Sequence, residues 1–312
     1  MRYNFNPENP DELRRQIDGK VIFSGSFADS EENAHIIIPE GIEEIAENAF
    51  RDFSHLKKVS FPKSLRKISA AAFSGCKSLT RVEFNIGLTD ILDEAFAFCP
   101  SLAEISLPDT VKRIGEGAFE GCATLSSVKL SESLEVICSG AFSYCFNLRD
   151  ITIPDSVVLI EFCAFASCFA LEGVKLSANM RLLDEGIFEG CRSLKQVDMP
   201  AGLVKIGRRA FSGCASLPYL ILPISLKEIG FDAFAGCTSL RSIAIPKELR
   251  EIEDEDIFSS CDSLAEITFG GSREEWEYLT HGKTITVSRS DLSVSTPRVS
   301  FLNLKKGEDN QS

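Results

Sequence analysis

Apolar residues recur along this chain in a pattern that repeats every 23 residues. One clear copy is LAEISLPDTVKRIGEGAFEGCAT, residues 102–124. Its first part alternates apolar and polar positions around Ile105 and Leu107, which predicts a strand with one buried face. Proline or another turn-compatible residue follows, and it ends the strand because proline has no N–H to donate. The pattern holds from residue 36 to residue 269 and gives ten units.

The second part of each unit predicts two further elements. Residues Val111 to Ile114 read as a second short extended segment. The motif G-x-x-A-F-x-x-C follows, and it places Ala118, Phe119 and Cys122 on one face of a helix. We therefore expect one or two helical turns at this point in every unit.

Three positions carry nearly the same apolar residue in every unit. The phenylalanines are Phe50, Phe73, Phe96, Phe119, Phe142, Phe165, Phe188, Phe211, Phe234 and Phe258. The cysteines are Cys76, Cys99, Cys122, Cys145, Cys168, Cys191, Cys214, Cys237 and Cys261. The leucines are Leu56, Leu79, Leu102, Leu125, Leu148, Leu171, Leu194, Leu217, Leu240 and Leu264. We call these the Phe, Cys and Leu ladders.

One unit alone cannot bury its apolar side, but stacked units bury a continuous core. The sequence therefore predicts an α/β repeat solenoid, a leucine-rich repeat right-handed superhelix. Parallel strands are expected on its concave face and short helical turns on its convex face. Residues 1–35 are expected to form an N-terminal cap and residues 270–300 a C-terminal cap, in which Trp276 and Leu279 fold over the stack. A strand is expected from Thr284 to Val287, and residues 301–312 are expected to be mostly disordered.

The charge of the chain excludes some partners. Its net charge is −13, with no basic stripe, so phosphate backbones and anionic membrane surfaces repel it. No segment approaches the roughly 20 apolar residues that a membrane span requires. The N-terminus as written also lacks a signal peptide. We therefore expect no nucleic-acid partner, no membrane insertion and, by sequence, an intracellular location.

The residues that could carry chemistry are few. The chain has 11 cysteines, but no C-x-x-C pair and no zinc-ligand spacing, so we expect no metal and no cofactor. The Cys ladder is expected to be buried and unreactive, whereas Cys138 and Cys163 lie off the ladder and are expected to be more accessible. Only His35 and His55 could meet, and no nucleophile motif accompanies them. The sequence predicts no enzyme activity.

The L-x-x-I-x-I-P…I-G-x-x-A-F-x-x-C unit resembles the BspA-like leucine-rich repeat family, a bacterial surface-antigen type. The resemblance covers residues 36–269, and Gly271 to Trp276 resembles a common ending in that family. It implies a solenoid associated with adhesion or protein binding. Members are often secreted or attached to the cell surface, which contrasts with the missing leader. The matching residues are all structural, so the resemblance assigns no site.

Candidate binding residues must occupy the variable positions of the units. The exposed positions of the first strand are mostly polar and include Lys175 and Asp198. One unit, LPYLILPISL, instead places apolar residues on nominally exposed positions, namely Pro218, Tyr219, Ile221 and Ile224. Tyrosine is favoured at binding hot spots, so this unit is the first candidate. The alternative is a tolerated exposed apolar group.

A second candidate lies near the Phe ladder. Aromatic residues occupy variable positions in units three to six, where other units have small or charged residues. They are Phe98, Tyr144, Phe146, Phe162 and Phe169. They either form an apolar patch for association or pack sideways on one another.

Two functions remain open at this point. The first is a non-enzymatic protein-binding or adhesion module that uses its exposed faces. Its partner would be a protein from a host or the same cell, with a carbohydrate as the other option. The second is a structural protein that self-assembles weakly through the aromatic residues near the Phe ladder.

Overall fold

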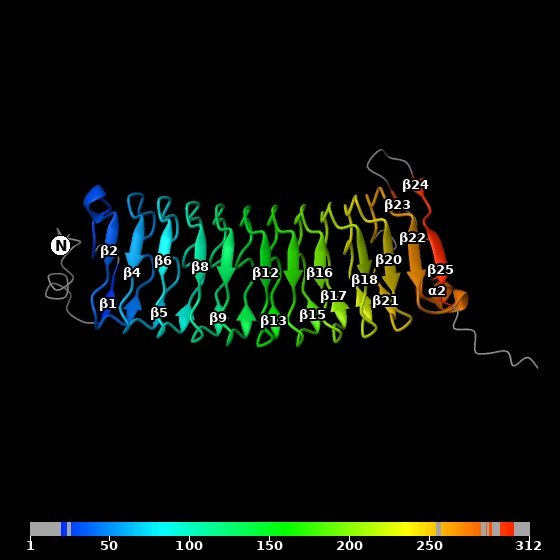
Figure 1. Cartoon of the computed structure of the whole chain (residues 1–312), viewed down its shortest axis with the longest axis horizontal. Helices are drawn as coiled ribbons and strands as arrows, with labels where there is room; N and C mark the ends of the chain where they lie inside the picture. The colour runs from blue at the N-terminus through cyan, green and yellow to red at the C-terminus, as the bar shows by residue number, and fades with distance from the viewer. Residues whose placement is uncertain are drawn as a thin grey trace, which may run out of the picture.

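The structure is a computed structural model, and it describes residues 20–23, 26–253, 257–281, 285, 287–288 and 294–302. The chain winds into coils that stack along one long axis (Figure 1). Each coil contains a strand of three or four residues, a second strand of two residues, and a turn segment that carries the Phe ladder. The first and last described strands, β1 and β25, lie at opposite ends of the stack.

The longer strands form one row along the stack. They are β2 (His35–Ile37), β4 (Lys58–Ser60), β6 (Arg81–Glu83), β8 (Glu104–Ser106), β10 (Ser127–Lys129), β12 (Asp150–Thr152), β14 (Gly173–Lys175), β16 (Gln196–Asp198), β18 (Tyr219–Ile221), β20 (Ser242–Ile245), β22 (Glu266–Phe269) and β25 (Arg298–Phe301). Paired strands run parallel, and Val59 aligns with Val82 one repeat later. After the 24-residue step, Ile243 aligns with Ile267. We call the outer surface of this row the strand face.

The two-residue strands form a second row. They are β1 (Val21–Ile22), β3 (Glu44–Ile45), β5 (Lys67–Ile68), β7 (Asp90–Ile91), β9 (Arg113–Ile114), β11 (Val136–Ile137), β13 (Leu159–Ile160), β15 (Leu182–Leu183), β17 (Lys205–Ile206), β19 (Glu228–Ile229) and β21 (Glu251–Ile252). Strand β9 lies within the segment Val111 to Ile114, so the second extended segment of the unit is present. The fold is therefore a parallel-strand solenoid with two rows of strands.

The prediction of helical turns around the Phe ladder is wrong. This third side of each coil consists of consecutive turns, and we call its outer surface the turn face. In one coil, the Ala95 and Ala97 amides donate to carbonyls three residues earlier, those of Leu92 and Glu94. An α-helix would use carbonyls four residues earlier. Helical structure in the described residues is confined to the two ends of the stack.

The intervening amides of the same coil point along the stack. Those of Glu94, Phe96 and Phe98 donate to carbonyl oxygens of the next coil at 2.6–2.8 Å. Glu94 and Phe98 have φ values of 54° and 55°, in the left-handed region. Each such residue reverses the direction of the next amide, which an uninterrupted right-handed helix cannot do. Hydrogen bonds between coils thus replace the expected helical ones.

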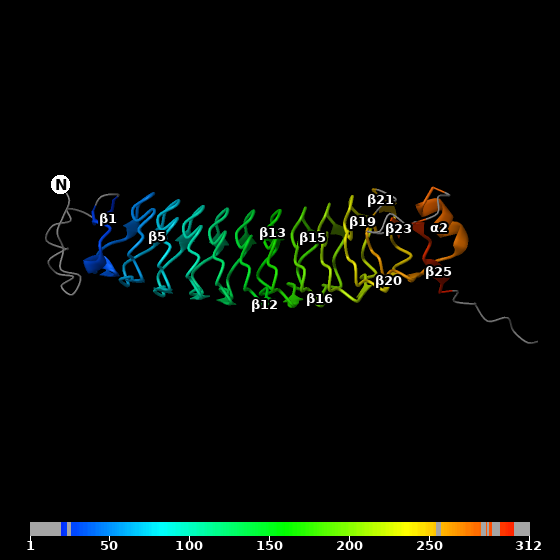
Figure 2. The same ribbon diagram turned by 90° about the horizontal axis from the view of Figure 1, so that it is seen from above.

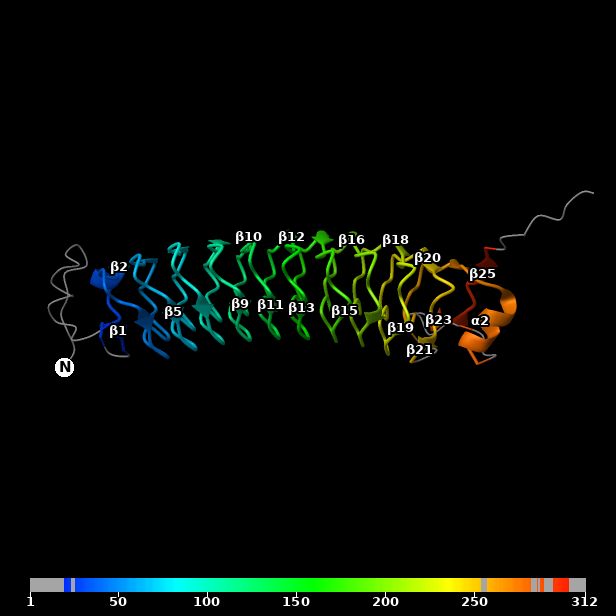
Figure 3. The same cartoon turned by 90° about the horizontal axis from the view of Figure 1, so that it is seen from below.

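The hydrogen bonds between coils, which stand in place of helical ones, also affect the shape of the stack. A convex helical side would be wider than the strand side and would curve the solenoid. Here the turn face is held at the spacing of its own bonds between coils, so it adds no such wedge. The stack runs nearly straight in three views (Figure 1, Figure 2 and Figure 3).

The Phe ladder runs through the centre of the core. All ten rings are fully buried. Successive rings stack with centroids 4.9–5.8 Å apart. At the N-terminal end, Phe27 covers Phe50, with their ring centroids 5.1 Å apart. The ladder is thus continuous from the first coil to the last.

The C-terminal end is closed by the helix α2 (Arg273–Leu279). Ser272 and Glu275 form a capping box at its start, which satisfies two amides that a helix leaves free. Trp276 and Leu279 are buried as expected, and the Trp276 ring lies 5.2 Å from that of Phe269. Strand β25 then pairs with β22. The expected strand at Thr284 to Val287 lies partly outside the described residues. Strand β23 (Val287–Ser288) begins at its last residue.

The row of longer strands is interrupted twice, between β10 and β12 and between β16 and β18. At the second interruption, the residue before the strand has no backbone N–H to donate. In other coils an amide just before the strand donates to the preceding coil, as Lys195 does to Glu172 at 2.9 Å. The corresponding residue before β18 is Pro218, which has no N–H.

Candidate functional site

Strand β18 and the turn that follows it carry three strongly exposed apolar side chains. Tyr219, Ile221 and Ile224 are 63%, 74% and 75% exposed. Strand alternation turns Tyr219 and Ile221 outward while it buries Leu220 and Leu222 in the core. We call the three exposed residues the strand-face patch.

Neighbouring residues explain why this patch is uncovered. On one side, strand β20 places Ser242 beside Tyr219 and Ala244 beside Ile221, and both are too small to shield them. On the other side, the sheet is interrupted at Pro218. Tyr219 and Ile221 are therefore uncovered on β18, the edge strand of a four-stranded sheet.

The two charged candidates of the strand face are also exposed. Lys175 and Asp198 are aligned in the register of β14 and β16. Asp198 accepts a hydrogen bond from the Gln196 amide at 2.8 Å. No ion pair joins Lys175 to Asp198. Both side chains are therefore exposed and do not pair with each other, on the two strands that precede β18 in its row.

The aromatic candidates all lie on the turn face, and three of them touch. Phe146 and Phe169 stack in adjacent coils with ring centroids 4.9 Å apart. Tyr144 meets the Phe146 ring edge-on at 6.2 Å. Phe98 and Phe162 lie outside this group and are 53% and 52% exposed. Phe146 and Phe169 therefore pack sideways on one another, as one of the two alternatives predicts. Phe98 and Phe162 do not take part in this packing and remain exposed.

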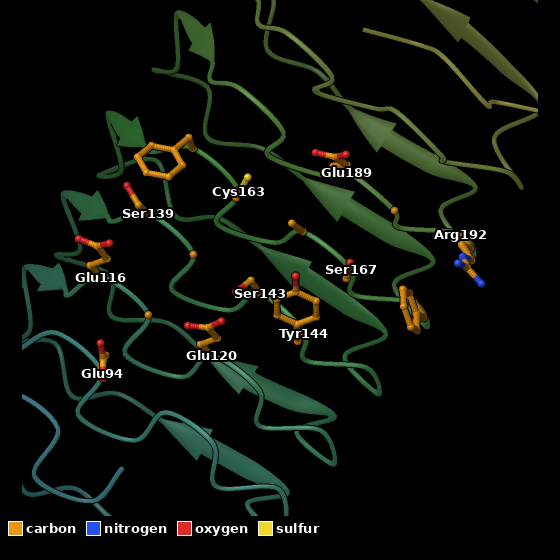
Figure 4. A pocket seen from close by; sticks show the side chains of 16 residues that line it. Glu94, Glu116, Glu120, Ser139, Ser143, Tyr144, Cys163, Ser167, Glu189 and Arg192 are labelled. Atoms are coloured by element: carbon orange, nitrogen blue, oxygen red, sulfur yellow. The ribbon is translucent and has the colours of Figure 1, made fainter. Parts of the chain in front are cut away.

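A groove of about 510 Å³ follows the turn face through these coils. Tyr144, Phe162 and Phe169 contribute its aromatic walls. Glycine and serine line the groove between the large side chains, as at Gly140 and Ser143, and their small size leaves this space open. Figure 4 shows the labelled side chains that surround this space. We call it the turn-face groove.

The groove also carries acidic groups that had not been singled out from the sequence. Glu94, Glu116 and Glu120 lie together at one end and Glu189 lies apart from them (Figure 4). Burial raises the pKa of Glu120, and the charges of Glu94 and Glu116 raise it further. Glu94 lies in one coil and Glu116 and Glu120 in the next, at three different positions of the repeat, so no single repeat position reveals this cluster.

Arg192 is the one basic side chain among the residues that line the groove. It follows Phe146 and Phe169 at the same position of the next coil, and its guanidinium lies 4.8 Å from the Phe169 ring centroid. This distance is within the range of a cation–π interaction. One end of the groove is therefore acidic, and the other already holds a cation on an aromatic ring.

The cysteines are structural in this fold. All nine members of the Cys ladder are buried, and burial raises the pKa of thiols such as Cys122 and Cys145. The prediction that Cys138 is accessible is wrong, because it is buried and burial raises its pKa to about 11. Cys163 is partly exposed and lines the groove, but burial and the nearby Glu189 and Glu185 raise its pKa.

Ser54, His55 and Asp29 have the residue types of a catalytic triad. The Nδ1 atom of His55 lies 3.2 Å from both the Ser54 hydroxyl and the Asp29 carboxylate. A triad requires the two ring nitrogens to face different partners. The Ser54 hydroxyl instead donates to Asp29 at 2.8 Å. Burial raises the pKa of Asp29, but hydrogen bonds from His55 and Ser54 outweigh this effect and lower it. The group ties the first coils together.

The stacked coils, with their periodic leucines and parallel strands, define a leucine-rich repeat solenoid. A family model described as "BspA type Leucine rich repeat region (6 copies)" matches residues 20–149, 89–218 and 158–283. The chain belongs to this BspA-type leucine-rich repeat family.

Similar solved structures come from bacterial leucine-rich repeat proteins. One from Bacteroides ovatus is 27% identical over 90% of this chain and 87% of its own, with a TM-score of 0.43. A leucine rich cell surface protein from Faecalibacterium prausnitzii is 27% identical over 78% and 81%, with a TM-score of 0.42. A T. pallidum leucine rich repeat protein is 32% identical over 67% and 86%, with a TM-score of 0.47. A comparison with curated proteins found no significant match. No helix in the described part of the chain is long and apolar enough to cross a membrane.

Proposed function

We propose that this chain is a non-enzymatic module that binds another protein through the strand-face patch. The observation that carries this proposal is the exposure of Tyr219, Ile221 and Ile224 on an otherwise mostly polar face. The regular positions of the repeat are used for the core, so these side chains are free to serve a partner. An adhesive role is the form this function would take at a cell surface.

The chemistry of the patch suits a protein partner. A tyrosine ring contributes a large contact area with little loss of conformational freedom, and its hydroxyl remains able to hydrogen bond. Ile221 and Ile224 add apolar surface, and the two preceding strands of the row add polar side chains, Asp198 on β16 and Lys175 on β14. Binding hot spots have this arrangement of a central apolar anchor and polar surroundings.

The test compares affinity capture from host-cell and same-cell lysates by three proteins: the native chain, the double variant Tyr219→Ala/Ile221→Ala, and the control Tyr278→Ala/Ile86→Ala. The control removes the same residue types from positions that are 84% and 81% exposed. We expect a set of captured proteins that the control retains and the patch variant loses. Equal capture by all three proteins would contradict the assignment. Binding to immobilised glycans that only the patch variant loses would indicate a carbohydrate partner.

A further inference from the structure

We propose that the turn-face groove binds an arginine- or lysine-rich extended segment of a partner protein. This is a second surface on a different side of each coil from the strand-face patch, and the proposal does not depend on that patch. Four observations support it: aromatic walls, unpaired acidic groups, an internal arginine–aromatic contact, and aromatic residues at unfavourable backbone positions.

The carboxylates of the groove lack partners of their own. Glu94, Glu116 and Glu120 take part in no ion pair within the described part of the chain, although other surface carboxylates do, such as Glu135 with Lys112 at 2.9 Å. Burial raises the pKa of Glu120, and repulsion from Glu94 and Glu116 raises this pKa further. A cation bound between them would remove this repulsion, so the groove is complementary to positive charge.

The aromatic residues of the groove show how such a cation can be held. The Arg192 guanidinium lies over the Phe169 ring, 4.8 Å from its centroid, at one end of the groove. Tyr144 and Phe162 offer exposed rings in the same groove, 46% and 52% exposed, with no cation over them. Because the coils repeat, a partner's arginine could take the same relation to these rings as Arg192 takes to Phe169.

Two large aromatic residues of the turn face occupy backbone positions that favour glycine. Tyr144 and Phe98 have φ values of 59° and 55°. The same turn position holds glycine in other coils, including Gly121 and Gly190. A bulky residue at positive φ is an outlier that costs about 1–2 kcal/mol of folding free energy. An aromatic ring at this position therefore works against the fold, which favours a role in binding.

A second copy of this chain is a poor occupant. Each copy has a net charge of −13, so an acidic groove repels it. A basic segment avoids this repulsion and places its alternating side chains on carboxylates and rings. An extended segment also suits the groove, which runs across several coils rather than forming a closed pocket.

The probe for this proposal is a fluorescein-labelled oligoarginine peptide, titrated by fluorescence anisotropy into the full chain. Glu116→Gln/Glu120→Gln removes two groove carboxylates. Its matched control is Glu104→Gln/Glu132→Gln, which changes the net charge equally at exposed positions outside the groove. We expect the groove variant to weaken binding about tenfold and the control less than about twofold, as for loss of a close rather than a distant charge.

A second pair of variants tests the rings without changing charge. Tyr144→Gly/Phe162→Ser installs residues found at the equivalent positions of other coils, and Tyr219→Ala is the control outside the groove. We expect about fivefold weaker binding for the first variant and no change for the control. Thermal unfolding of every variant confirms that the fold is retained.

Three results would overturn the proposal. Equal losses in the groove and control carboxylate variants would mean that the peptide responds only to the overall charge. Unchanged binding by Tyr144→Gly/Phe162→Ser would remove the rings from the site. A dimer in sedimentation experiments that the groove variants abolish would make a second copy the occupant. Because the strand-face patch is intact in both groove variants, failure here is distinguishable from failure of the proposed function.

Discussion

The Cys122 thiol donates a hydrogen bond to the backbone carbonyl of Phe96, 26 residues earlier, over 3.3 Å. Each of the nine Cys-ladder thiols makes the corresponding bond to the preceding coil at 3.1–3.3 Å. A cysteine at this position fills a small dry space and also supplies a weak donor to a buried carbonyl. The two ladders are therefore one connected feature of the core.

Two core substitutions should differ in their effects on stability. Phe142→Ala leaves a cavity inside the Phe ladder and should lower the free energy of unfolding by about 3–5 kcal/mol. Cys122→Ala removes one sulfur atom and its weak bond, and should lower it by about 1–2 kcal/mol. Urea unfolding followed by circular dichroism measures both. A Cys122→Ala effect as large as that of Phe142→Ala would contradict this account of the ladders.

The strand-face patch should be dispensable for folding. Tyr219 and Ile221 are 63% and 74% exposed, so their truncation removes little buried surface. The double variant Tyr219→Ala/Ile221→Ala should change the free energy of unfolding by less than about 0.5 kcal/mol per site. Differential scanning calorimetry beside the Tyr278→Ala/Ile86→Ala control measures this. A markedly lower Tm for the patch variant alone would assign these side chains to the fold.

Tyr144→Gly should not lower the stability of the chain. Glycine adopts the φ of 59° found here without strain, which contributes about 1 kcal/mol in its favour. The edge-on contact between Tyr144 and Phe146 is lost and offsets part of this gain. Gly140→Tyr, which places the same ring at another positive-φ position, is the reverse experiment and should lower the Tm. A clear fall in Tm for Tyr144→Gly would mean that its ring supports the turn.

Native thiols should react slowly, and Cys163 should react first. It is the partly exposed cysteine, while the others are buried. Burial raises the pKa of Cys163, and Glu189 and Glu185 raise it further, so little thiolate forms at neutral pH. Titration with a disulfide reagent should therefore give one slow phase that Cys163→Ser removes, followed by the rest on unfolding. A fast phase that persists in Cys163→Ser would contradict this assignment.

The acidic end of the turn-face groove should give a pH-dependent stability. The pKa of Glu120 is raised in the fold, so the unfolded carboxyl group loses its proton at a lower pH than the folded one. Ionisation therefore penalises the fold fully above the folded pKa, and this penalty shrinks as the pH falls through that value and is lost below the unfolded pKa. Glu120→Gln should be more stable than the native chain at about pH 7 and equal to it at about pH 4. Equal Tm values at both pH values would contradict the raised pKa.

The repeat unit itself was predictable because it depends on local spacing. The Phe, Cys and Leu ladders, the strand around Ile105 and the second extended segment ending at Ile114 all follow from a 23-residue register. Each is an apolar position that must point inward in every coil. The burial of Trp276 at the C-terminal end was equally predictable, since an open stack exposes its core.

The turn segments and the groove required the tertiary structure. The motif around Phe119 has a helical spacing of apolar residues, and periodicity alone cannot tell a helix from stacked turns. The segment forms turns because its backbone amides bond to the next coil, as the Phe96 amide does to the Ala118 carbonyl at 2.8 Å. The acidic end of the groove needed that stacking too, because Glu94 and Glu116 are 22 residues apart in sequence. Residues in adjacent coils become neighbours only once the spacing between coils is set, and that spacing is a property of the whole stack.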